Sequence, residues 1–198
     1  MNYFRYRSTN VFFVKSSTSD RLLAIDAGWP RTLYEYARGL KSLGYRLDQV
    51  SWALVTHFHM DHAGLIGEFL ERGIACFIFE NQGEGIDDME RIIGRTCKEY
   101  TPIRKEALLR IESPASRDHL AGLGIRAEVI LTPGHSPDSV SYISDEGEAI
   151  IGDLPPPGQI MPDDTECLAS WEAIRRKKVR TIYPSHAAVF ELEDSLGD

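Results

Sequence analysis

The sequence has only three cysteines in 198 residues. Cys76, Cys97 and Cys167 are odd in number, lie far apart and include no C-x-x-C pair, which argues against disulfides and against a thiolate zinc site. The sequence also lacks a run of about 18 apolar residues, the length that spans a membrane. Residues 1–8 contain no apolar segment typical of a secretory signal peptide. We therefore expect a cytoplasmic protein with no membrane-spanning segment.

Basic residues are fewer than acidic residues. Lysine and arginine number 22 against 30 acidic residues, and the formal net charge is -8. A surface of this charge repels polyanions, so nucleic acid is disfavoured as a partner and a small-molecule substrate is favoured. A basic cluster runs against this trend, and we interpret it as the solvated end of a helix rather than a phosphate site. It consists of Arg175, Arg176, Lys177, Lys178 and Arg180.

The composition is that of a folded globular chain, with 42% hydrophobic and 26% charged residues. At roughly 150 residues per domain, the length favours one domain rather than two. We find no internal repeat, low-complexity tract or linker. Residues 1–198 are therefore predicted to form a single domain, and the sequence carries no signal for its oligomeric state.

Hydrophobic patterning predicts alternating strands and helices. Short apolar runs bounded by polar or turn residues predict strands over residues 11–14, 22–25, 50–56, 75–79, 128–131, 139–144, 149–151 and 181–183. Apolar residues at helical spacing predict helices over residues 32–43, 63–71 and 166–178. Residues 81–109 are more polar and mostly helical by pattern, with an interruption at Pro102, and residues 113–116 are predicted to be a loop. The alternation indicates an α/β fold.

A dense group of metal-binding residue types follows one predicted strand. Residues 56–64 read T-H-F-H-M-D-H-A-G. Side chains two apart on an extended segment point the same way, so His57 and His59 can bind one ion. Asp61 and His62 lie where the chain turns into the next helix and can face a second ion. A solvated histidine-rich loop is the alternative, but so many polar groups beside a buried strand would be costly to leave unpaired.

Three more polar motifs follow predicted strands. His135 lies in T-P-G-H-S, Asp153 in the pair G-D, and His186 in P-S-H. Each is weak alone, yet together with the first motif they place five of the six histidines at strand ends. Imidazole suits zinc or iron and carboxylate suits harder ions, so the mixture does not by itself select one metal.

These motifs together resemble those of the metallo-β-lactamase superfamily, in order and over nearly the whole chain. The resemblance implies a four-layer αββα sandwich with the site at one edge of the two sheets. It implies that His57, His59 and His135 hold the first metal, that Asp61, His62 and His186 hold the second, and that Asp153 bridges both. Asp26 matches the remaining motif and would orient the ligand loop, although a turn aspartate before Gly28 is the alternative.

The chemistry that this site implies is hydrolysis. Two divalent ions, most favourably zinc with iron or manganese as alternatives, lower the pKa of a shared water and polarise a carbonyl or phosphoryl oxygen. Asp61 is our candidate catalytic residue, orienting that water and carrying its proton. We find no Ser-His-Asp order and no glycine-rich phosphate loop that indicates another chemistry.

The sequence differs from individual branches of this superfamily, and these differences narrow the range of expected substrates. True lactamases of this fold usually have Cys or Ser where this chain has Asp153, and they are exported, so antibiotic hydrolysis is disfavoured. Glyoxalase II enzymes append a helical domain, whereas 12 residues follow His186 (198 − 186), which disfavours that exact thioesterase. A small ester, thioester or lactone is expected. The alternatives are a phosphodiesterase or nuclease of the same fold, a mononuclear iron persulfide dioxygenase and a non-catalytic metal-binding module.

Substrate choice is expected to reside in residues 80–124, the longest segment without a predicted ligand. Tyr100, Arg104, Arg117 and His119 are the candidate contacts. His119 lies outside every motif and is interpreted as a surface or substrate-loop residue rather than a ligand.

Overall fold

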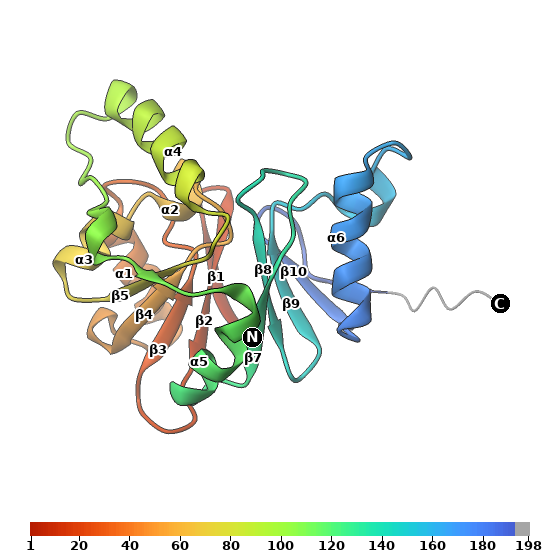
Figure 1. Cartoon of the computed structure of the whole chain (residues 1–198). Helices are drawn as coiled ribbons and strands as arrows, with labels where there is room; N and C mark the ends of the chain where they lie inside the picture. The colour runs from red at the N-terminus through yellow and green to blue at the C-terminus, as the bar shows by residue number, and fades with distance from the viewer. Residues whose placement is uncertain (193–198) are drawn as a thin grey trace.

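Two β-sheets packed face to face form the centre of the structure (Figure 1). The computed structural model describes residues 1–192. Within them, one sheet has the order β1-β2-β3-β4-β5-β6 and the other the order β11-β10-β9-β8-β7. The strands of the first sheet are β1 (Asn2–Tyr6), β2 (Thr9–Lys15), β3 (Leu22–Ile25), β4 (Val50–Leu54), β5 (Ala75–Ile78) and β6 (Leu109–Arg110). Those of the second are β7 (Ala127–Leu131), β8 (Val140–Ser144), β9 (Glu148–Gly152), β10 (Thr181–Pro184) and β11 (Phe190–Glu191).

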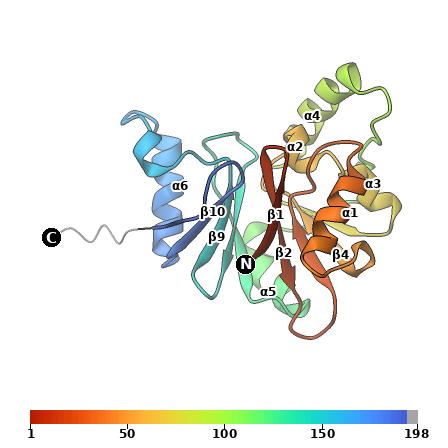
Figure 2. The same ribbon diagram turned by 180° about the vertical axis from the view of Figure 1, so that it is seen from behind.

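Helices cover the outer face of each sheet (Figures 1 and 2). The helices are α1 (Leu33–Ser42), α2 (Met60–Ala63), α3 (Ile66–Glu71), α4 (Gly83–Thr96), α5 (Ser116–Gly122) and α6 (Thr165–Arg176), and single 3-10 turns span Leu47–Gln49, Lys105–Ala107, Ser113–Ala115 and Pro157–Gln159. Helices α1, α3 and α4 pack on the first sheet, and α6 packs on the second. No helix in residues 1–192 has the length and apolar character needed to cross a membrane.

The core consists of three apolar layers, and the alternation of side chains along β3 shows how they form. Leu22 and Ala24 pack with the helices on the outer face of the first sheet, whereas Leu23 and Ile25 point between the two sheets. Because successive side chains of a strand point to opposite faces, a strand buried on both sides is apolar throughout. On the far side, Trp171 of α6 packs in the cluster that covers the outer face of the second sheet. The predicted αββα sandwich is confirmed.

Strand direction brings the polar motifs together. β3, β4 and β5 are parallel neighbours, as are β9 and β10, so their carboxyl ends lie at the same edge of the sandwich. The loop after β4 contains His57, the residue after β9 is Asp153, and His186 follows β10. The β7–β8 loop, which contains His135, lies at this edge too, because Val140 at its end donates a backbone hydrogen bond to the Thr56 carbonyl.

Several local predictions differ from the structure. Strands β1, β6 and β11 were not predicted, and the helix expected over residues 63–71 is divided into α2 and α3. Gly64 lies at this division because a Cβ there would lie 2.2 Å from the backbone nitrogen of Pro30. The expected loop over residues 113–116 is a 3-10 turn leading into α5, where the Ser116 hydroxyl accepts a hydrogen bond from the backbone N–H of Val129.

Candidate metal centre

Three histidines form one group of nitrogen atoms at the edge of the sandwich. His57 Nε2 lies 3.0 Å from His59 Nδ1, and His135 Nε2 lies 3.1 Å from the same His59 atom. His57 is fully buried, whereas His59 and His135 are more accessible. The strand-end loop after β4 supplies two members of the group, and the β7–β8 loop supplies the third. We call His57, His59 and His135 the first ligand group.

A second group lies directly beside the first. His186 Nε2 is 3.1 Å from Asp61 Oδ2, and His62 Nε2 is 3.4 Å from the same oxygen. Asp61 and His62 come from the short helix α2, which begins immediately after His59. We call Asp61, His62 and His186 the second ligand group.

Asp153 lies between the two groups. Its Oδ2 is 3.5 Å from His135 Nε2 in the first group and 3.2 Å from His186 Nε2 in the second. Its Oδ1 is 3.4 Å from His62 Nε2. The structure therefore brings together all seven residues singled out in the sequence, and it places the carboxylate of Asp153 where both groups can share it.

The spacing of these atoms suits bound metal ions. Zinc–nitrogen bonds of about 2.0–2.1 Å with tetrahedral angles hold ligand atoms about 3.3 Å apart. The neighbouring ligand atoms of the two groups lie 3.0–3.4 Å apart. In addition, His62 Nε2 and Asp153 Oδ1 are buried without a hydrogen-bond partner. Buried polar atoms are rarely left unsatisfied, so an ion at this position would resolve both cases.

Asp26 holds His62 in the orientation that a ligand needs. It is completely buried at the end of β3, and its Oδ2 lies 2.8 Å from His62 Nδ1. The carboxylate also accepts hydrogen bonds from the backbone N–H and the hydroxyl of Thr56. An ionised carboxylate can only accept, so the N–H of His62 is at Nδ1 and its Nε2 lone pair faces the second group. These contacts favour the orienting role over the alternative of a turn aspartate before Gly28.

The turn between β1 and β2 contacts the second group. The hydroxyl of Thr9 donates to Asp61 Oδ2 at 2.9 Å, and the Ser8 carbonyl accepts from His186 Nδ1 at 2.8 Å. The side chain of Asn10 donates to the carbonyl of Pro184, just before His186. Thr9 lies 52 positions from Asp61 in the sequence, and Ser8 lies 178 positions from His186. Sequence reasoning missed these residues because no local pattern marks them.

The charge states of the cluster also suit metal binding. Burial lowers the pKa of His57 well below its usual range, and the neighbouring histidines add to this effect. Burial tends to raise the pKa of Asp153, but His62 and the other histidines outweigh this and lower it. The pKa of Asp61 is also lowered, because the nearby His62 ring and the hydrogen bond from Thr9 outweigh the opposing effect of burial. Neutral imidazole and ionised carboxylate are the forms that bind metals.

His62 differs from His57 in its electrostatic surroundings. Burial acts to lower its pKa, yet Asp26, Asp153 and Asp61 together raise that pKa well above the usual histidine range. These carboxylates therefore favour a positive charge at this position, which a metal ion bound at Nε2 would supply.

Comparison with known proteins agrees with the fold. Residues 5–186 match the description of the metallo-beta-lactamase superfamily. The chain belongs to this superfamily. A structure with the same superfamily fold, TTHA1623 in a di-iron-bound form, matches with a TM-score of 0.67 at 19% identity, over 92% of this chain and 89% of that one. At this identity the likeness shows the fold.

Relatives by sequence include proteins described as hydrolases. The chain is 26% identical over 165 residues to the probable metallo-hydrolase YflN of Bacillus subtilis, covering 72% of this chain and 58% of that protein. It is 22% identical over 132 residues to a hydroxyacylglutathione hydrolase of Idiomarina loihiensis, covering 67% of this chain and 41% of that protein. The chain spans 58–60% of the length of the first three curated relatives that it matches.

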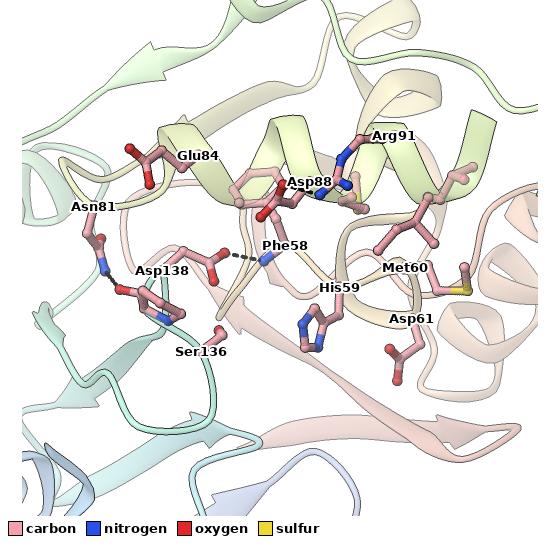
Figure 3. Close-up of a pocket in the computed structure, with 15 residues that line it drawn as sticks. Phe58, His59, Met60, Asp61, Asn81, Glu84, Asp88, Arg91, Ser136 and Asp138 are labelled. Carbon is pink, nitrogen blue, oxygen red and sulfur yellow. Dashed lines mark hydrogen bonds and ion pairs between the residues drawn. The ribbon is translucent and has the colours of Figure 1, made fainter. Parts of the chain in front are cut away.

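A cavity of about 480 Å³ adjoins the two ligand groups (Figure 3). His59 and Asp61 lie on one side of it, and α4 lies on the other. The segment 80–124 thus contributes α4 to the cavity wall. The four side chains named as candidate contacts are not among the lining residues: Tyr100, Arg104, Arg117 and His119.

Three of those four side chains have structural partners elsewhere, and Tyr100 donates a hydrogen bond to Glu90 of α4. Arg117 donates to Asp145 and Glu128, at the end of the second sheet that lies away from His135. The ring of His119 packs edge-on against Phe77 of β5, with ring centroids 4.8 Å apart. The expectation that Arg117 and His119 contact a substrate at the metal centre is therefore wrong, because α5 lies at the opposite edge of the sheets (Figure 1).

Proposed function

We propose that this superfamily member is a hydrolase that uses two divalent metal ions on a small ester, thioester or lactone. The observation that supports this most is the pair of ligand groups that share Asp153 beside an open cavity. In this proposal His57, His59 and His135 hold the first ion, and Asp61, His62 and His186 hold the second. Asp153 contributes to both. Zinc is the proposed metal, and the di-iron form of the structural neighbour makes iron the first alternative.

In the proposed chemistry, the metal ions and the side chain of Asp61 have different roles. Two such ions, when bound, supply a nucleophile near neutral pH and polarise the substrate carbonyl. Asp61 is proposed to orient the attacking water through a hydrogen bond and to accept its proton. The hydrogen bond from Thr9 fixes Asp61 Oδ2, and the lowered pKa of Asp61 keeps the carboxylate ionised.

The proposed substrate class is a small acyl compound. Two sequence relatives are named as hydrolases, one of them for hydroxyacylglutathione. The net charge of -8 supports a small molecule over nucleic acid as the partner. A cytoplasmic location remains a prediction from the sequence.

The test is a substrate panel measured on protein reloaded with zinc, iron or manganese. The panel contains p-nitrophenyl esters, lactones, thioesters and bis-p-nitrophenyl phosphate. We expect turnover of an ester, thioester or lactone that a chelator abolishes, that metal restores and that Asp61→Ala loses. His119→Ala is the matched control, because this histidine lies outside the cluster and should leave the rate unchanged.

Other outcomes of the panel would replace the proposal. Turnover of the phosphodiester alone would indicate a phosphodiesterase. Oxygen uptake with glutathione persulfide would indicate the iron dioxygenase. Metal binding without any metal-dependent turnover across the panel would favour a non-catalytic module.

A further inference from the structure

The cavity beside the ligand groups lies between the loop that contains His59 and the helix α4 (Figure 3). Its volume of about 480 Å³ falls in the range of pockets that bind small molecules, about 300–1,000 Å³. Because His59 and Asp61 form part of its wall, a group bound at the metals would have a direct path into it.

Much of the cavity wall is apolar. Phe58 and Met60 contribute from the ligand loop, and Met89 and Ile92 contribute from α4. Ile92 is 52% exposed, which is unusual for a large aliphatic side chain on a helix whose other apolar residues, such as Met89, are buried. The wall is therefore suited to a hydrocarbon chain rather than to a polar one.

The charges on this wall are mainly negative. Glu84 and Asp88 lie one turn apart on the same side of α4, and both line the cavity. Asp88 is paired with Arg91 at 2.6 Å, whereas Glu84 has no hydrogen bond or ion pair within residues 1–192. Asp138, on the opposite wall, is nearly buried and accepts the backbone N–H of Phe58 at 2.6 Å. Among residues 1–192, Glu84 is thus the cavity carboxylate that has neither a hydrogen-bond nor an ion-pair partner.

Helix α4 is held close to the opposite wall. A Cβ at Gly85 would lie 2.3 Å from Asp138 Oδ2, so glycine allows this approach without displacing the Asp138 side chain. Just before the helix, the side chain of Asn81 donates to the carbonyl of Pro137 (Figure 3). These contacts fix the width of the cavity before any ligand arrives, and they keep Glu84 on its rim.

We propose that this cavity binds the acyl arm of the substrate and selects an apolar arm that is uncharged or ends in a cation, with Glu84 as the specificity-determining residue. This inference rests on the proposed function, because it takes the adjoining groups to bind the reacting end of the substrate. A hydrocarbon arm contacts Met60, Met89 and Ile92. A terminal ammonium group approaches Glu84, whereas a terminal carboxylate is repelled.

The first test measures binding rather than turnover. Hydroxamates bind metal ions through one end, so zinc-loaded protein is titrated calorimetrically with 6-aminohexanohydroxamate, hexanohydroxamate and adipic monohydroxamate. We expect the ammonium compound to bind about tenfold more tightly than the carboxylate compound, as one nearby unit charge in a mostly aqueous setting allows. Glu84→Gln should reduce this ratio to about threefold or less, and Glu84→Lys should reverse it.

A matched control removes a charge from the same helix outside the cavity. Asp87 is exposed and paired with Lys105, and it does not line the cavity. Asp87→Asn should therefore preserve the preference of the wild type. Equal preferences in wild type and Glu84→Gln would overturn the role of Glu84, and so would an equal loss in Asp87→Asn.

The second test locates the arm. The chain has four methionines, Met1, Met60, Met89 and Met161, and two of them line the cavity. In protein labelled with ¹³C at the methionine methyl groups, hexanohydroxamate should shift the Met60 and Met89 signals beyond the effect of acetohydroxamate, which has the same metal-binding end. Met1 and Met161 should not respond to the longer arm.

The results separate this inference from the proposed function. If the methionine signals respond to the longer arm and the preference depends on Glu84, but no substrate is hydrolysed, the proposed role of the cavity is supported and the hydrolase proposal is contradicted. If a substrate is hydrolysed but the Met60 and Met89 signals do not respond to the longer arm, the hydrolase proposal is supported and the proposed role of the cavity is contradicted. If no hydroxamate bound to the zinc-loaded protein, the cavity proposal would be overturned as well, because its ligand is anchored at the metals.

Discussion

Replacing Asp26 by asparagine removes the charge that orients the second ligand group while keeping the side-chain shape. The carboxylate accepts hydrogen bonds from the Thr56 backbone at 2.7 Å and from the Thr56 hydroxyl at 3.0 Å, and it contacts His62 Nδ1 at 2.8 Å. The asparagine side chain has one oxygen where aspartate has two. Its NH₂ group would therefore face at least one of the Thr56 or His62 donors, which would lose its acceptor. Asn also tolerates the φ of +67° at this position, which alanine would adopt only with strain.

The magnitude follows from the hydrogen bonds that are lost. Each buried donor left without an acceptor costs about 1–3 kcal/mol, so one or two such donors should lower the free energy of unfolding by about 2–4 kcal/mol. That is a large part of the about 5–15 kcal/mol that a domain has. Loss of a carboxylate that orients a ligand histidine typically weakens metal binding about 10–100-fold. The effect should fall on the second ion, because Asp26 contacts His62.

Two measurements separate these effects. Guanidinium unfolding of the metal-free protein reports the structural cost, and zinc competition with a fluorescent chelator reports the affinity of each ion. Asp48→Asn is the control, since Asp48 is an exposed aspartate paired with Arg46. An Asp26→Asn protein that unfolded at the wild-type guanidinium concentration and bound zinc with wild-type affinity would refute the reasoning.

Two further predictions concern the neighbours of the second ion. Asp153→Ala should lower the occupancy of both ions, whereas Asp61→Ala should retain about one ion, as elemental analysis of protein checked by circular dichroism would show. Loss of both ions in Asp61→Ala with both kept in Asp153→Ala would reverse the assigned roles. Thr9→Val should weaken the second ion about fivefold to tenfold, because Asp61 Oδ2 loses its hydroxyl donor, and Thr9→Ser should restore it. Equal zinc affinities for Thr9→Val and Thr9→Ser in a chelator titration would contradict this role of the hydroxyl.

The arrangement of the ligand groups could be predicted from sequence because each motif directly follows an apolar strand. The side-chain alternation that ends β4 places His57 and His59 together, and parallel pairing brings Asp153 and His186 to the same edge. The burial of β3 on both faces is likewise visible as four consecutive apolar residues. These features depend on local patterning and on strand direction, both of which the sequence records.

Other features depend on contacts between distant segments, which no local pattern records. Thr9 and Ser8 reach the second group only because the β1–β2 turn extends to the same edge as α2. The placement of α4 on the cavity depends on the approach of Gly85 to Asp138. For the same reason the substrate contacts expected at Arg117 and His119 were misplaced, since their segment turns away to pack against β5 and the start of β7.

The most direct test of the proposed centre is the number of metal ions that each folded chain binds. Native mass spectrometry of wild-type protein after mild metal reloading should show two ions per chain, because two groups of three ligands lie side by side with Asp153 between them. The His119→Ala protein should show the same number. A reproducible ceiling of one ion per chain would contradict the two-ion centre and favour the mononuclear iron dioxygenase.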